Sequence, residues 1–315
     1  MHFIHAWEQL NYYHSAETAQ KYLYSCYKGL NKDKAELKSY ENCYPFIYFL
    51  QHGEIYYNQA EKSPFAIKPV LLFYGLIHLI KACLLTVDPN YPETTSVLAH
   101  GVSSRKKKKQ HYQFVNDEIK IQKMGLCTHF SSKMFHVEQL DGEKIVMKDL
   151  FLQIPELDDY YLFQHTENIV RIKRNRNTFF IPKKILDKYH FTIDSFIRFL
   201  KQRNCLNILH SEFNDEHIIL TCTEDSLPSL PFRYHLNKNC YCLPTKQSNY
   251  MYYPELMIHY LLLYNLSMVA RYETEWWGEV LKTTPTNDYP LIKAFLSSTE
   301  KKSPILVWQY LNNKP

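Results

Sequence analysis

Three polar residues lie one helical turn apart inside a long apolar segment of this sequence. Tyr74, His78 and Lys81 interrupt the apolar run of residues 69–85, and their spacing places them on one face of a helix. A phenol, an imidazole and an ammonium group in one row can hold an anion, or they can pair with other polar groups inside a core. Because buried polar groups need partners, this row predicts either a ligand site or a buried polar network.

A second apolar segment, near the C-terminal end, carries polar residues in the same manner. Tyr264, Ser267 and Arg271 share one face of the helix expected there. A buried guanidinium requires a carboxylate or a bound anion, and Glu255 and Glu273 are acids close to it along the chain. The candidate residues for a ligand site or a polar network are Tyr74, His78, Lys81, His100 and Arg271.

Arg203 and His210 form a third candidate. Their order, an arginine followed by a polar residue, a spacer and a histidine, is similar to the motif with which HEPN-type ribonucleases engage the scissile phosphate. A chance match of this kind is expected in a chain that contains 15 histidines. The pair also falls where a helix is predicted to end and a strand to begin, whereas that family carries the motif on a helix. Arg203 and His210 are therefore catalytic candidates only under an alternative, ribonuclease hypothesis.

Two clusters of basic residues are candidates for a charged surface. Five consecutive cations precede His111 in a segment without an apolar face, and a second cluster follows about sixty residues later. Such runs can follow a phosphate backbone or bind an acidic protein, but they are also typical of solvated loops. The basic residues are Arg105, Lys106, Lys107, Lys108 and Lys109, then Arg171, Lys173, Arg174 and Arg176.

The eight cysteines do not follow the spacing of a metal site. Cys240 and Cys242 are separated by one residue, whereas paired zinc ligands need two or more between them. Two thiols side by side on a strand are the simpler interpretation, although Cys222 and His235 leave a zinc site as an alternative. No glycine-rich phosphate loop or serine elbow is present, so we expect neither a metal nor a cofactor.

Composition favours a globular protein of the cytoplasm. The chain of 315 residues is 45% hydrophobic with a net charge of +5, and its first residues lack the basic flank and apolar core of a signal peptide. Reduced cysteines in apolar surroundings fit the same compartment. The two apolar segments are too short and too polar to predict a membrane span, so no contact with a membrane is expected.

Periodicity predicts helices at both ends of the chain and strands between them. Ser15 and Gly29 bound one helix, and Pro45 lies in the first turn of another that extends to Ala60. Between Phe130 and Leu243, short alternating runs predict antiparallel strands, with turns at Asn214-Asp215 and Asn237–Asn239. The expected fold is α+β: a mainly helical body formed by the N- and C-terminal helices, with a small antiparallel sheet in the central segment. The expected regions are 1–125, helical with the basic loop; 126–250, α+β; and 251–315, helical and packed on the first.

Several motifs stand together in one order along the chain. They are Lys68-Pro69, Phe73–Ala82, Pro89–Pro92 with His100–Lys108, Asp117–Lys123 and Leu266–Tyr272. Together they resemble the bacterial YaaC family over nearly the whole sequence. The helix of Tyr74, His78 and Lys81 is, more remotely, similar to the core helix of HEPN-type domains. The YaaC resemblance implies a shared fold and a cytoplasmic location without an assigned activity. It also implies a link to guanine-nucleotide synthesis, because members are encoded beside the gene for IMP dehydrogenase.

These observations lead to one functional expectation and two alternatives. The chain is expected to be a non-enzymatic regulatory or interaction protein, with IMP dehydrogenase as the partner that the resemblance implies. The first alternative is a HEPN-like RNA-binding protein or ribonuclease, which would use the two basic clusters. The second is a purine-nucleotide site around Tyr74, His78, His100 and Arg271. The sequence leaves the oligomeric state open.

Overall fold

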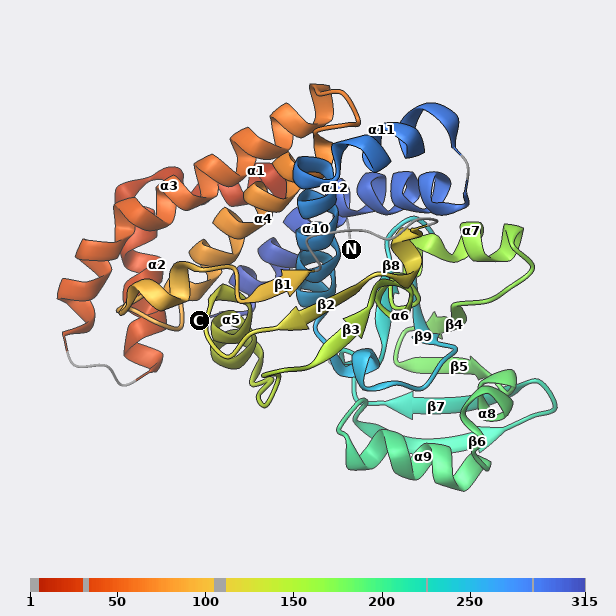
Figure 1. The fold of residues 1–315 in the computed structure, drawn as a ribbon. Helices are drawn as coiled ribbons and strands as arrows, with labels where there is room; N and C mark the ends of the chain where they lie inside the picture. The colour runs from red at the N-terminus through yellow and green to blue at the C-terminus, as the bar shows by residue number, and fades with distance from the viewer. Residues whose placement is uncertain (1–5, 31–33, 105–111, 225, 285, 315) are drawn as a thin grey trace. The chain divides into compact units, whose positions relative to one another are not determined.

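The computed structural model describes residues 6–30, 34–104, 112–224, 226–284 and 286–314 (Figure 1). The chain divides into two compact units. Unit 1 combines Met1–Met147 with Leu256–Pro315, and unit 2 consists of Lys148–Glu255. The expected α+β class is confirmed, because helices from both ends of the chain form unit 1 and antiparallel sheets occur in the middle. The finer division into 1–125, 126–250 and 251–315 stays a prediction.

Unit 1 is mainly helical. Its helices are α1 (Ala6–Asn11), α2 (Ala16–Gly29), α3 (Ala35–Lys62), α4 (Lys68–Leu85), α5 (Leu126–Phe135), α10 (Glu255–Tyr272), α11 (Thr274–Thr283) and α12 (Asp288–Asn312). A small antiparallel sheet accompanies them, in the order β1 (Val102–Ser104), β2 (Glu118–Ile121) and β3 (Lys144–Val146). Strands β1 and β2 lie before residue 126, in a part of the chain where no strand was predicted.

Helices α3 and α4 run side by side and approach closely at two glycines (Figure 1). A Cβ atom added to Gly53 would lie 2.6 Å from the Leu79 side chain, and one added to Gly75 would lie 2.7 Å from the ring of Tyr57. Each glycine therefore makes room for a large side chain of the other helix. Gly53 lowers the intrinsic helix propensity of α3, and this packing compensates for that loss.

The start of α3 differs from the prediction. The helix begins at Ala35, so Pro45 lies in its interior rather than in its first turn. An interior proline removes one backbone hydrogen bond. Phe46, Ile47 and Leu50 are nevertheless fully or almost fully buried, and this packing holds the helix together through the proline.

The two apolar segments of the sequence become α4 and α10, which are in contact. Phe73 of α4 lies against Tyr260 and Tyr264 of α10, with ring centroids 5.4 and 5.7 Å apart. The buried polar residues of α10 are paired: His259 Nδ1 lies 2.9 Å from the hydroxyl of Thr299, and the amide of Asn265 donates to Asp117. Contrary to the expectation from the sequence, α4 is long and apolar enough to cross a membrane by length and composition; 67% of that stretch is buried in the structure.

Unit 2 is built on a six-stranded sheet covered by helices. The strand order is β6-β7-β5-β4-β9-β8, and neighbouring strands are antiparallel. Its helices are α6 (Met147–Phe151), α7 (Asp158–Phe163), α8 (Lys184–Tyr189) and α9 (Ile193–Gln202). Its strands are β4 (Ile169–Asn175), β5 (Thr178–Pro182), β6 (Ile208–Phe213), β7 (His217–Cys222), β8 (Arg233–His235) and β9 (Cys240–Pro244). Phe196 and Leu200 of α9 pack on Phe179 and Leu220 of the sheet, which forms a core of its own in this unit.

Candidate functional site

The structure brings the predicted ligand or network residues of unit 1 into one group. Tyr74, His78 and Lys81 come from α4, Arg271 from α10, and His100 from the segment before β1. Two residues of α3 complete the group. We call it the cationic aromatic patch; its members are His52, Tyr56, Tyr74, His78, Lys81, His100 and Arg271.

His78 lies at the centre of the α3 side of the patch. Its ring is stacked on Tyr56 at 5.6 Å between centroids, and the His52 ring lies 5.2 Å away. Tyr56 is also stacked on Tyr74, at 6.2 Å. The Nδ1 atom of His78 is buried without a hydrogen-bond partner among the described residues. The helical spacing of α4 therefore presents a row of rings with an unused polar atom.

His100 is held in place through its backbone. Its carbonyl oxygen accepts hydrogen bonds from the Tyr260 hydroxyl, at 2.8 Å, and from the Cys127 amide, at 3.1 Å. The next residue, Gly101, has a φ of +73°, and an added Cβ at Gly125 would lie 2.3 Å from Gly101. Only glycine permits this close crossing of two backbones. The crossing places the imidazole 6.2 Å from the Tyr74 ring.

Arg271 closes the other side of the patch. Its Nε donates to the carbonyl oxygen of Ser267, and its Nη1 donates to the hydroxyl of Tyr74 at 3.2 Å. Within the part of the chain that the structure describes, no carboxylate lies within ion-pair distance of Arg271 or Lys81. The carboxylate partner considered from the sequence, Glu255 or Glu273, is not seen. The guanidinium is half-buried, so solvent or a ligand can reach it.

The pKa values of His78 and His100 are lowered first by burial and then by neighbouring positive charges. Burial, followed by the charges of Lys81 and His52, lowers the pKa of His78 to about 4. Burial, followed by the charges of Arg271 and Lys81, also lowers the pKa of His100. Burial alone lowers the pKa of Lys81. Both imidazoles are therefore neutral near pH 7, and they can accept a proton when an anion binds beside them.

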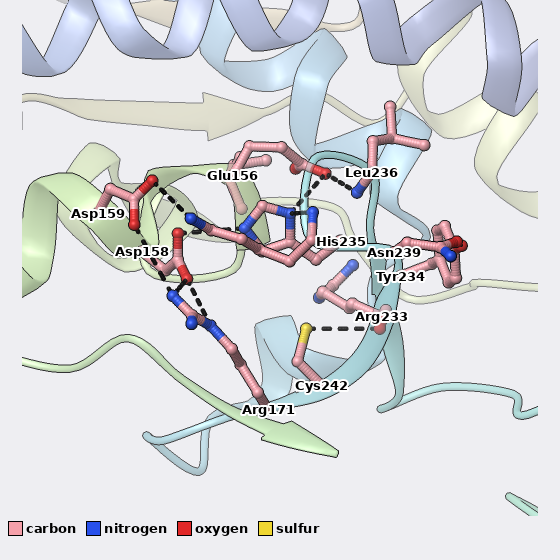
Figure 2. A network of polar contacts seen from close by, with 12 residues as sticks. Glu156, Asp158, Asp159, Arg171, Arg233, Tyr234, His235, Leu236, Asn239 and Cys242 are labelled. Carbon is pink, nitrogen blue, oxygen red and sulfur yellow. Dashed lines mark hydrogen bonds and ion pairs between the residues drawn. The ribbon is translucent and has the colours of Figure 1, made fainter. Parts of the chain in front are cut away.

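A second polar cluster lies in unit 2 (Figure 2). His235 is 1% exposed, and its Nε2 lies 3.1 Å from Asp158, which also accepts hydrogen bonds from Arg171. The Nδ1 of His235 accepts the backbone N–H of Lys238 and lies 3.9 Å from Glu156. An acid–histidine–acid row resembles catalytic machinery, but both ring nitrogens are engaged and the imidazole is closed to solvent. We interpret it as a structural network that ties α7 to β4 and β8.

The pair considered under the ribonuclease hypothesis does not form a shared site. The Arg203 guanidinium lies 4.1 Å above the ring of Tyr252. His210 is an exposed residue of β6, opposite Thr221, and lies 3.9 Å from Glu212. The two side chains thus have different neighbours, and His210 stands on a strand rather than on a helix.

The basic residues of the second cluster have separate roles. Arg171 forms ion pairs with Asp158 and Asp159. Arg174 lies over the ring of Phe179 at 4.9 Å. Lys173 and Arg176 are exposed. The first cluster, Arg105, Lys106, Lys107, Lys108 and Lys109, lies outside the described residues, so its place relative to the second stays a prediction.

Sequence reasoning missed the contribution of α3 to the patch. His52 and Tyr56 stand four residues apart, a signal that points to one helix face. The partner helix could not be recognised from that spacing. The zinc alternative gains no support either, because the described residues contain no group of three histidine, cysteine or acidic residues placed to hold a metal ion.

A comparison with known protein families shows the family to which the chain belongs. The family described as YaaC-like protein matches residues 11–311. The chain belongs to the YaaC-like family. No curated protein and no solved structure matches it, and the remote HEPN-type likeness is not shown. Membership in the YaaC-like family assigns no reaction, so the function has to be argued from the patch.

Proposed function

We propose that this YaaC-like protein is a non-enzymatic regulator that binds a purine nucleotide at the cationic aromatic patch. One observation carries the proposal: Arg271, His78 and His100 contact the rings of Tyr56 and Tyr74, and no acid is paired to Arg271 or Lys81 among the described residues. Lys81 lies over the ring of Phe49, which is itself next to the ring of His78. The patch residues are half-buried, apart from the exposed His52, so a ligand can reach them.

The charge of the patch selects an anion. A guanidinium and an ammonium group whose positive charges are not neutralised attract phosphate more strongly than they attract any neutral ligand. The arginine offers a planar fork of donors, and its position is fixed by Tyr74 and the backbone of Ser267. His78 and His100 add two imidazoles that gain a proton, and with it a charge, beside a phosphate.

The rings of the patch select an aromatic ligand. Tyr56 and Tyr74 are stacked at 6.2 Å, and Arg271 lies over the ring of Tyr74 at 5.7 Å. Stacking of a base on such a ring contributes about 1–3 kcal/mol. A nucleotide combines a phosphate with a flat base, so it satisfies both halves of the patch. The larger face of a purine favours it over a pyrimidine.

Thermal unfolding with purine nucleotides tests the proposal. GMP, IMP, GTP and ATP are each added to the whole protein, with inorganic phosphate and UMP for comparison. A ligand present at a hundred times its Kd stabilises the protein by about 2.7 kcal/mol. Arg271→Gln and Lys81→Gln should remove the stabilisation. Lys293→Gln should keep it, because Lys293 is an exposed lysine that lies over the ring of Tyr289, which is not a member of the patch. Absence of stabilisation by every purine would reject the nucleotide.

The partner is a separate part of the proposal. The choice of IMP dehydrogenase as the partner rests on the resemblance of the chain to the YaaC family. That resemblance implies a link to guanine-nucleotide synthesis. Purified IMP dehydrogenase is mixed with the protein, with and without the nucleotide that stabilises it, and the mass of any complex is measured. A complex that Arg271→Gln weakens would support a nucleotide-dependent contact. Two proteins that migrate separately under both conditions would reject this partner without rejecting the ligand.

A further inference from the structure

One face of α3 is exposed although it carries large side chains. Five apolar or aromatic residues on it are between 50% and 66% exposed. We call this face the α3 stripe; its members are Leu37, Tyr40, Tyr44, Tyr48, His52 and Ile55. Successive members are three or four positions apart, so they line one side of the helix. The opposite side, with Phe46 and Leu50, is buried against the rest of unit 1.

The spacing of the α3 stripe reads the same in both directions. Starting from Leu37, the intervals are three, four, four, four and three residues. An apolar residue stands at each end, an aromatic ring lies next to it, and Tyr44 and Tyr48 flank the midpoint. Their rings are 6.1 Å apart. A partner of unrelated sequence gives no reason for such symmetry, whereas an interface between two identical helices in antiparallel orientation requires it.

One pair of opposite charges beside the stripe follows the same symmetry, and its lysine, Lys38, also pairs with Glu41 of its own helix at 2.9 Å. When two copies of α3 are aligned antiparallel about residue 46, Leu37 faces Ile55 and Lys38 faces Glu54 of the other copy. Both ends of the pair then bring an ammonium group to a carboxylate. The same alignment sets Tyr44 opposite Tyr48, which covers the exposed rings.

We infer that the α3 stripe is the contact between two copies of this protein, which pair antiparallel as a two-fold dimer. The rings of Tyr44 and Tyr48 form the centre of the contact. Lys38 and Glu54 fix its orientation, because a parallel pair would bring like charges together. His52 also belongs to the cationic aromatic patch, so Tyr40 of the second copy comes to the edge of that patch.

Exchange of charges at the ends of the stripe tests the dimer. Sedimentation velocity of the whole protein from 1 to 100 µM, on the order of the range in which contacts of modest size associate, gives the dissociation constant. Lys38→Glu and Glu54→Lys should each weaken association at least tenfold, because each places two like-charged pairs in the contact. An equimolar mixture of the two variants should associate again, since every pair is then attractive. This rescue cannot arise from a folding defect.

A second pair of variants separates the stripe from other exposed rings. Tyr44→Lys should abolish association with an unchanged circular dichroism spectrum. Phe163→Lys, at a ring of α7 that is 79% exposed, should leave association as it is. A protein that stays monomeric at 100 µM would overturn the inference. So would a dimer that tolerates Tyr44→Lys, or single-charge variants that fail to associate when mixed.

Discussion

The Arg271 guanidinium donates a hydrogen bond to the hydroxyl of Tyr74 over 3.2 Å, between residues 197 positions apart in the sequence. The bond joins the last turn of α10 to α4. It also keeps the guanidinium over the Tyr74 ring, at 5.7 Å, in the patch for which we propose nucleotide binding.

Removal of the Tyr74 hydroxyl should weaken nucleotide binding without unfolding the protein. Tyr74→Phe keeps the ring but frees one end of Arg271, and a bond of this kind contributes about 1 kcal/mol. Since about 1.4 kcal/mol corresponds to a tenfold change in Kd, a loss of about 1 kcal/mol should raise the Kd measured by calorimetry three- to tenfold. Tyr272→Phe is the matched control: Arg271 also lies over this exposed ring, at 5.1 Å, but of the two hydroxyls its hydrogen bond goes to that of Tyr74. Equal affinities for Tyr74→Phe and the unaltered protein would count against this role.

Binding of an anion at the patch should strengthen as the pH falls. The pKa of free His78 is lowered to about 4, and a bound phosphate raises it again. Between pH 6.5 and 4 the complex therefore takes up a proton on forming, so its affinity rises as pH is lowered through this window. A cyclic purine nucleotide is the suitable probe, because the charge of its phosphodiester is constant here. His78→Gln should flatten the dependence of affinity on pH. An equally steep dependence in that variant would show that a group other than His78 takes up the proton.

Loss of the Asp158 carboxylate should destabilise unit 2. Burial raises the pKa of Asp158, but hydrogen bonds from His235 and Arg171 outweigh that effect and lower it to about 2. Asp158→Asn should lower the free energy of unfolding, measured with urea at pH 7, by about 3 kcal/mol, because it removes the negative charge from a buried network. Asp159→Asn removes a neighbouring carboxylate whose side chain is 69% exposed, and should cost under about 1 kcal/mol. Similar losses for the two variants would contradict the structural role of the network.

The same carboxylate predicts an acid-sensitive window. The pKa of Asp158 lies near 3.8 in the unfolded chain and about 2 in the folded one, so the unfolded chain binds more protons between these values. The contribution of Asp158 to the free energy of unfolding is fully present above about pH 4 and is lost as the pH falls towards 2. Asp158→Asn should lose this part of the acid dependence, as measured by urea midpoints at pH 2, 3 and 4.

Replacement by alanine should destabilise the protein at Gly53, where α3 meets α4, and stabilise it at Gly278, where there is open space. Gly53→Ala introduces a Cβ atom 2.6 Å from Leu79, and overpacking of this kind costs about 1–3 kcal/mol. Gly278→Ala, in α11, meets nothing within 4 Å and should gain up to about 1 kcal/mol of helix propensity. Thermal unfolding of both variants measures the difference. A stabilised Gly53→Ala protein would show that Leu79 moves aside freely.

Local patterns in the sequence predicted the elements that have clear caps or turns. Ser15 caps α2 as expected, and the turns at Asn214 and Asn239 connect β6 to β7 and β8 to β9. Each of these signals lies within a few residues of the structure that it determines. The early start of α3 was not recognised, because tertiary burial of Phe46 and its neighbours overrides the proline signal of Pro45.

The candidate site was predicted only in part for the same reason. Periodicity placed Tyr74, His78 and Lys81 on one face, which is a property of a single helix. The contribution of α3 depends on the packing of Gly53 and Gly75, and the position of His100 depends on a crossing of two backbones. No local pattern encodes either contact.

The interrupted layout of unit 1 has a consequence for synthesis on the ribosome. Helices α10 and α12 leave the exit tunnel after the whole of residues 148–255, yet α4 packs against both of them. The apolar surface of the first 147 residues therefore stays exposed until α10 and α12 have been synthesised. Residues 148–255, in contrast, contain all the residues of their own hydrophobic core. A chaperone that shields α4 during this interval would be expected to act before translation ends.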